Sequence, residues 1–143
     1  MDDTTIASHG CDWISTAQES FLSFEKVGIV EKLENENLFD AVTALSGSGP
    51  AYLYYLCECL EQAATELGLD QDFAMRFSRQ TIIGAAATLK ELPASAEELR
   101  VNVTSKGGTT EAALEVLMGS NNLQNLFSNA LKSAHKRALE LAI

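Results

Sequence analysis

The sequence predicts an all-α fold, a bundle of helices with one possible short strand near the N-terminus. Apolar residues recur at helical spacing over most of the chain after residue 37. Capping residues, glycines and prolines stand where such helices should begin and end. Residues 27–33 form the only strand-like run. Together these features favour helices packed on helices over a sheet-based fold.

The N-terminal part of the chain gives the weakest signals. Residues 1–14 show no periodicity and are expected to form a tail or linker. Ser15 and Gln18 have capping-box spacing, so a helix is expected to follow to about Lys26. After the strand-like run and a polar break, a short helix is expected to begin at Asn37.

The middle of the chain predicts two long helices. A loop rich in glycine and serine, residues 46–50, leads into the first, with Pro50 at its start. Gly68 is expected to end that helix in the C′ position. Asp70 is expected to cap the second helix, which Pro93 stops.

The C-terminal part of the chain predicts three more helices. Ser95 and Glu98 form another capping box, which opens a short helix to about residue 103. A helix follows residue 110 and stops at Gly119. Asn121 or Asn122 then caps the last helix.

Composition narrows the classes of partner. At 143 residues the chain has the size of one domain, and 46% hydrophobic residues exclude disorder as the default. A net charge of −10 argues against nucleic acid or an anionic membrane surface, and no run is apolar enough to span a bilayer. Three cysteines without a framework indicate a reduced, cytoplasmic protein. With two histidines and no Cys/His cluster, no metal site is expected.

The two long helices between residues 50 and 92 are apolar over most of their circumference. A helix that is apolar on all sides must be covered on all sides, and one chain of this length has few elements to do so. A partner chain is therefore expected. The alternative is a simple compact bundle.

The loop at residues 104–110, Thr-Ser-Lys-Gly-Gly-Thr-Thr, is the strongest functional signal. Gly107 and Gly108 permit unusual backbone conformations and the close approach of a ligand. Thr109 and Thr110 stand where a helix begins, and its free N–H groups and dipole favour an anion such as a carboxylate or phosphate. The alternative interpretation is an ordinary glycine turn with a threonine cap.

Three segments resemble the C-terminal domain of Δ1-pyrroline-5-carboxylate reductase. Residues 40–52 resemble the start of that domain, and residues 80–86 resemble its middle helix. Residues 99–114, with the pattern Leu-Arg-x-Asn-Val-Thr-Ser-x-Gly-Gly-Thr-Thr-x-x-Ala-Leu, resemble its signature segment. The resemblance covers about residues 25–142.

The resemblance implies an enzyme that reduces pyrroline-5-carboxylate to proline with NADPH or NADH. It implies a helical domain that intertwines with its partner into a homodimer, and dimers that can assemble further. The loop would bind the carboxylate of the imino acid substrate. By resemblance, Ser105 and Thr110 supply hydroxyls, while Gly107, Gly108 and Thr109 supply amides. Thr110 is also the candidate catalytic residue, as proton donor to the ring nitrogen.

The chain departs from the family pattern in the loop and in the nucleotide domain. Lys106 stands where the family usually has proline, and it either favours the carboxylate or points to solvent. The family's N-terminal Rossmann domain has no counterpart in residues 1–40. Residues 15–34 resemble only its last helix and strand, and residues 35–143 form the helical domain.

The chain is therefore expected to be a piece of a longer reductase or the product of a truncated gene. Alone, it is expected to bind no nucleotide cofactor and to be inactive. The alternative function is a non-catalytic helical dimerisation module that has lost the nucleotide domain.

Overall fold

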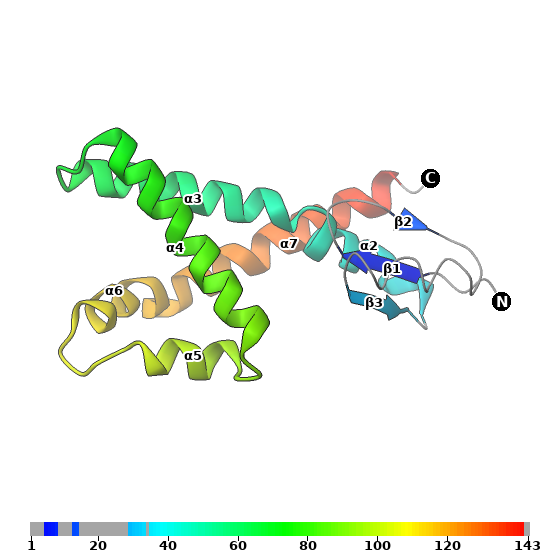
Figure 1. Ribbon diagram of the computed structural model, residues 1–143. Coiled ribbons are helices and arrows are strands. Elements are labelled where there is room, and N and C mark those ends of the chain that lie inside the picture. Colours follow the sequence, from blue (N-terminus) through cyan, green and yellow to red (C-terminus); the bar gives the residue numbers. More distant parts are fainter. Residues whose placement is uncertain (1–4, 9–12, 15–28, 34, 142–143) are drawn as a thin grey trace. The chain divides into compact units, whose positions relative to one another are not determined.

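The computed structural model describes residues 5–8, 13–14, 29–33 and 35–141 (Figure 1). The chain divides into two compact units, one made of residues 1–52 and 128–143 and the other of residues 53–127. The capping box at Ser15 and the helix expected after it lie outside the described residues.

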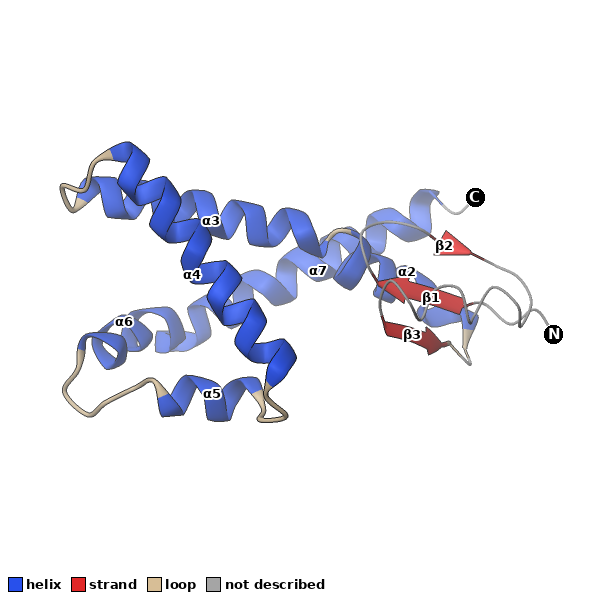
Figure 2. Cartoon of the chain, in the orientation of Figure 1, coloured by secondary structure: helices blue, strands red, loops and turns tan. Residues whose placement is uncertain are grey.

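A three-stranded antiparallel sheet in the order β2, β1, β3 belongs to the first unit (Figure 2). Its strands are β1 (Thr5–Ser8), β2 (Trp13–Ile14) and β3 (Ile29–Lys32). β3 confirms the strand expected within residues 27–33. β1 and β2 lie where a tail without strands was expected, because strands of four and two residues are too short to show alternation in the sequence.

The chain is helical almost without interruption from residue 36 to residue 66. The elements are the 3-10 turn η1 (Glu36–Leu38), α2 (Phe39–Val42), the π-helical turn η2 (Thr43–Gly47) and α3 (Gly49–Glu66). The prediction of a loop at residues 46–50 is therefore wrong for most of that segment. Pro50 does lie in the first turn of α3, as expected.

Side-chain hydroxyls explain why this glycine- and serine-rich segment stays helical. The Ser46 hydroxyl donates to the carbonyl of Val42 at 3.0 Å, one turn back. The Ser48 N–H reaches the carbonyl of Thr43 at 3.0 Å, five residues back, which widens the turn. The widened turn leaves the Ala44 carbonyl to accept from the Tyr52 hydroxyl at 3.0 Å. The chain thus bends at Ser48, between η2 and α3, while the backbone angles of Ser48 stay in the right-handed helical region.

The second unit holds the helices that carry the loop. These are α3 from residue 53 onward, α4 (Gln71–Glu91), α5 (Ala96–Asn102), α6 (Thr109–Met118), the 3-10 turn η3 (Gly119–Asn121) and the start of α7 (Asn122–Leu141). The long helices α3 and α4 follow one another through a tight turn and then diverge (Figure 1). Helices α3 and α4 do not pack closely together along their lengths.

The turn between α3 and α4 has the geometry that the sequence predicts. Gly68 has φ +94°, and its N–H bonds the carbonyl of Thr65 at 2.9 Å. The next N–H, of Leu69, bonds the carbonyl of Ala64 at 3.2 Å, which completes a Schellman motif. The Asp70 carboxylate then accepts from the N–H of Phe73 at 2.8 Å and caps α4.

The capping box predicted at the start of α5 is also present. The Glu98 N–H donates to the Ser95 hydroxyl at 3.2 Å, and the Ser95 N–H donates to the Glu98 carboxylate at 2.8 Å. The Ser95 N–H and the Ser95 hydroxyl, which donates at 2.9 Å, lower the pKa of the Glu98 carboxyl because both hydrogen bonds favour its charged form.

The fold class is confirmed as all-α over residues 36–141, yet the helices bury little of their own surface. Among the described side chains only Ala44, Ala74 and Ser78 are buried. Large apolar side chains of α3 and α4 remain exposed, including Tyr54 at 69% and Ile83 at 59%. The described part of the chain therefore contains little of the core that a stable globular domain needs. No helix in the described part of the chain is long and apolar enough to cross a membrane.

Candidate functional site

The loop at residues 104–110 begins where α5 ends. The Thr104 hydroxyl donates to the carbonyl of Arg100 at 2.6 Å, and its N–H bonds the carbonyl of Val101 at 3.0 Å. These bonds satisfy carbonyls at the C-terminal end of α5 that have no partner inside the helix. They also anchor the first residue of the loop to a rigid element.

A tight turn at residues 105–108 forms the centre of the loop. The Gly108 N–H bonds the carbonyl of Ser105 at 3.0 Å, which closes the turn. Gly107 has φ +74°, the value of the third residue of a type II turn. That position requires glycine, so the backbone conformation of Gly107 is explained by the turn itself.

Gly108 is glycine for a different reason. Its φ is −88°, which any residue can adopt, so positive φ does not explain it. A Cβ at this position would clash with the Ser105 hydroxyl and would lie 3.0 Å from the Ser105 carbonyl oxygen. Gly108 therefore allows the two ends of the turn to approach each other closely.

Helix α6 starts directly after the turn, with Gly108 as its N-cap. Because glycine has no side chain, no side chain caps the first turn of the helix. The N–H groups of Thr109 and Thr110 belong to the first turn, where no intrahelical partner exists. These amides, with the positive end of the helix dipole, form the part of the loop best suited to an anion.

The structure brings the five predicted site residues together on one turn and one helix start. Ser105, Gly107 and Thr109 are exposed, while Gly108 and Thr110 are half-buried. The two glycine amides, however, are already engaged, that of Gly108 with Ser105 and that of Gly107 with the Glu111 carboxylate at 2.6 Å.

Glu111 is the residue of this loop that the sequence analysis missed. It stands three residues after the N-cap, which is the spacing of a capping box, but glycine at the cap hides the usual pattern. Lys106 is exposed, and the structure records no bond from its side chain to any described residue.

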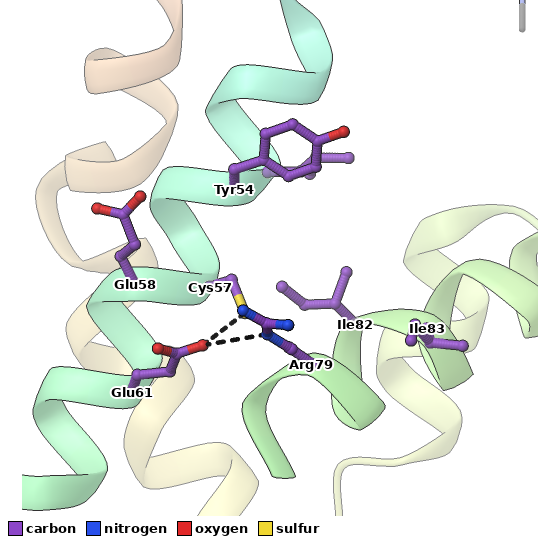
Figure 3. Close-up of a pocket in the computed structure, with 8 residues that line it drawn as sticks. Tyr54, Cys57, Glu58, Glu61, Arg79, Ile82 and Ile83 are labelled. Carbon is purple, nitrogen blue, oxygen red and sulfur yellow. Dashed lines mark hydrogen bonds and ion pairs between the residues drawn. The ribbon is translucent and has the colours of Figure 1, made fainter. Parts of the chain in front are cut away.

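A groove lies between α3 and α4 in this unit and has a volume of about 510 Å³ (Figure 3). Arg79 of α4 reaches the Glu61 carboxylate of α3 at 3.8 Å across it. Partial burial and the neighbouring Glu61 carboxylate raise the pKa of the Cys57 thiol, so the reactive thiolate is disfavoured. The rest of the lining is mainly apolar and includes Leu53, Tyr54, Ile82 and Ile83.

A mainly apolar lining and a disfavoured thiolate favour a packing role for this groove over a role in catalysis. The described residues also hold no group of three or more His, Cys, Asp or Glu side chains placed to bind a metal ion. The loop at residues 104–110 is therefore the better candidate site.

Comparison with known proteins gives a consistent result. A family model described as pyrroline-5-carboxylate reductase dimerisation matches residues 36–141. The pyrroline-5-carboxylate reductase of Pseudomonas aeruginosa is 43% identical over 116 residues, which are 81% of this chain and 42% of that protein. Pyrroline-5-carboxylate reductase 1 of Bacillus subtilis is 43% identical over 107 residues, which are 75% of this chain and 36% of that protein.

Solved structures agree with the sequence relatives. A pyrroline-5-carboxylate reductase from Coxiella burnetii matches with a TM-score of 0.81 and 43% identity, over 86% of this chain and 45% of that one. A pyrroline carboxylate reductase from Plasmodium falciparum, solved with NADP bound, matches with a TM-score of 0.75 and 28% identity, over 88% of this chain and 50% of that one. This chain thus spans half or less of each of these proteins, and it belongs to the pyrroline-5-carboxylate reductase dimerisation family.

Proposed function

We propose that this chain is the dimerising and substrate-binding half of a cytoplasmic pyrroline-5-carboxylate reductase. The observation that carries the proposal is a tight turn at residues 105–108 that leads directly into the start of α6, where no side chain caps the helix. The domain boundaries expected from the sequence, after residues 14 and 34, remain predictions. The nucleotide, NADP or NAD, would be held outside the helical domain. The relative from Plasmodium falciparum was solved with NADP bound, which supports such a cofactor in a complete reductase.

The homodimer is supported by the exposed surface of the helices. Leu53, Tyr54 and Ile83 lie on the walls of the groove between α3 and α4, and all three are more than half exposed. Burying such side chains against a second copy would supply a core that the described residues of one chain do not form. The name of the matching family, which includes dimerisation, points to the same partner. Dimers of dimers would follow from further contacts.

The substrate carboxylate would bind at the start of α6. The first-turn amides of Thr109 and Thr110 offer hydrogen bonds to its oxygens, and the exposed hydroxyl of Ser105 lies on the adjoining turn. The nicotinamide of the cofactor supplies hydride when it is bound. The residues of this chain would fix the imino acid for that transfer, and the Thr110 hydroxyl would give a proton to the ring nitrogen.

The proposal is tested by hydroxyl deletions in a complete reductase that carries this segment. A charge-assisted hydrogen bond is worth roughly 1.5–3 kcal/mol, so Ser105→Ala and Thr110→Ala should each lower kcat/KM by about tenfold to a hundredfold. Thr110→Ala should also lower kcat if its hydroxyl donates the proton, whereas Ser105→Ala should mainly raise KM. The control Thr88→Ala removes a hydroxyl that bonds only its own helix α4, and it should change neither constant.

A change at Gly108 should be more severe than either hydroxyl deletion. In Gly108→Val the new Cβ would clash with Ser105 and force the turn open. If both hydroxyl deletions leave kcat/KM within twofold of the parent, the loop is an ordinary turn without a role in substrate binding.

The second candidate function, a non-catalytic dimerisation module, is favoured by one observation. The amides of Gly107 and Gly108 are both engaged inside the loop and are not offered to a ligand. A complete reductase whose activity is insensitive to the loop variants, yet which needs this segment to dimerise, would support that function instead.

A further inference from the structure

The contact between Glu111 and Gly107 is the shortest charged hydrogen bond recorded in the loop. The Glu111 carboxylate accepts from the Gly107 N–H at 2.6 Å. In a standard capping box the third helical residue reaches back to the N–H of the N-cap. Here the N-cap is Gly108, whose own N–H is occupied by Ser105, and Glu111 reaches one residue further back.

This hydrogen bond restrains the backbone of Gly107, the residue whose conformation makes the turn possible. Gly107 is the one residue of the turn with positive φ, at +74°, and glycine loses more conformational freedom on ordering than any other residue. The preceding residue is Lys106, which lacks the ring that would preset the backbone for a type II turn. Two bonds therefore hold the turn, the Gly108 N–H to Ser105 and the Gly107 N–H to Glu111.

The position of Glu111 also leaves the anion-binding amides in place. A negative side chain in the first turn of α6 is stabilised by the helix dipole. Its recorded hydrogen bond goes back to Gly107, and the loop as described shows none from this carboxylate to Thr109 or Thr110. Glu111 can thus stabilise the turn while the amides of Thr109 and Thr110 remain available to bind an anion.

We propose that Glu111 is a positioning residue, which locks the turn at residues 105–108 so that the Ser105 hydroxyl and the first-turn amides of α6 face one carboxylate together. The inference rests on the proposed substrate-binding function of the loop. Glu111 acts through Gly107 and does not itself touch the substrate. The competing role, in which its carboxylate occupies the substrate's place, predicts the opposite change in affinity.

The test measures two quantities separately on the whole 143-residue chain: the hydrogen bond between Gly107 and Glu111, and the binding of L-proline, which is the probe. Amide hydrogen exchange of Gly107 reports the bond, and an NMR titration with L-proline reports carboxylate binding. Glu111→Ala removes the acceptor, and Glu111→Gln keeps an acceptor oxygen without the charge. Glu115→Ala is the matched control, because it removes an exposed carboxylate one turn further along the same helix. Helix content and oligomeric state are compared for all variants.

The expected result is loss of Gly107 protection in Glu111→Ala together with L-proline binding weaker by about tenfold or more, as for a lost charge-assisted bond. Glu111→Gln should restore both to within about threefold of the parent, and Glu115→Ala should match the parent. In a complete reductase, Glu111→Ala should raise KM far more than it lowers kcat, which general destabilisation would not do.

Three results would overturn the inference: an unprotected Gly107 amide in the parent, unchanged binding in Glu111→Ala, or tighter binding in both Glu111 variants. The last would make Glu111 a competitor of the substrate. A parent chain that binds no L-proline, but whose Gly107 protection depends on Glu111, would count against the proposed function and still support the lock.

Discussion

Replacing Lys106 with proline should stabilise the chain. Lys106 is the second residue of a turn whose third residue, Gly107, has φ +74°, and proline is favoured at the second position of type II turns. The structure records no hydrogen bond from the Lys106 N–H to a described residue, so proline removes no donor that the fold uses. Where the backbone already suits it, proline stabilises by about 0.4–1 kcal/mol, because it restricts the unfolded chain.

For a chain of this size that gain corresponds to a rise in melting temperature of about 1–4 °C, measured at fixed protein concentration. Lys106→Ala is the reference variant, because it removes the lysine side chain without restricting the backbone. Lys106→Pro should therefore melt above Lys106→Ala by that margin and should bind L-proline at least as tightly. A melting temperature below that of Lys106→Ala would refute the turn assignment at residues 105–108.

The remaining predictions concern assembly, activity and pH. The chain should sediment as a dimer at micromolar concentration, burying more than about 2,000 Å², and a folded monomer would contradict this. Ile83→Lys should weaken the dimer by at least about tenfold, since burying one isoleucine is worth about 1.5–3 kcal/mol; an unchanged sedimentation profile would place Ile83 outside the interface. The chain alone should oxidise no NADPH with pyrroline-5-carboxylate beyond a mock purification, and a rate proportional to added chain would disprove this. The hydrogen bonds from Ser95 lower the pKa of the Glu98 carboxyl. The stabilisation by the charged carboxylate is therefore fully present above the ordinary glutamate pKa and is lost as the pH falls through the lower pKa of the folded chain. Glu98→Gln should flatten the acid limb of the stability curve, and an unchanged acid limb would show that the carboxylate has no such effect.

Local signals in the sequence were sufficient to place most helix boundaries. Asp70, Ser95 and Gly68 each make a hydrogen bond to a residue three positions away, so the sequence pattern alone predicts their roles. The helical path through residues 46–50 was missed for a related reason. Serine and glycine usually break helices. Here the Ser46 hydroxyl bonds the carbonyl of Val42 and the Ser48 N–H bonds the carbonyl of Thr43, and the sequence does not specify either bond.

The candidate site was located from its residue types, but its internal bonds were not. Glycines beside hydroxyls before a helix predict an anion site, whichever amides are free. That Gly107 is held by Glu111 depends on the direction of one side chain, which the sequence does not specify. The sequence also could not show why each glycine is needed. Gly107 is explained by its positive φ, and Gly108 by its close approach to Ser105, and both observations come from the structure.

Few side chains are buried in the described part of one chain, and this has a consequence for how such dimers form and exchange subunits. When the core is completed only by a second copy, folding and association become one bimolecular reaction, and its rate depends on the concentration of new chains. Exchange of subunits between finished dimers then requires unfolding of both. Two variants mixed after purification should stay apart for long periods, whereas the same variants produced together should form mixed dimers from the start.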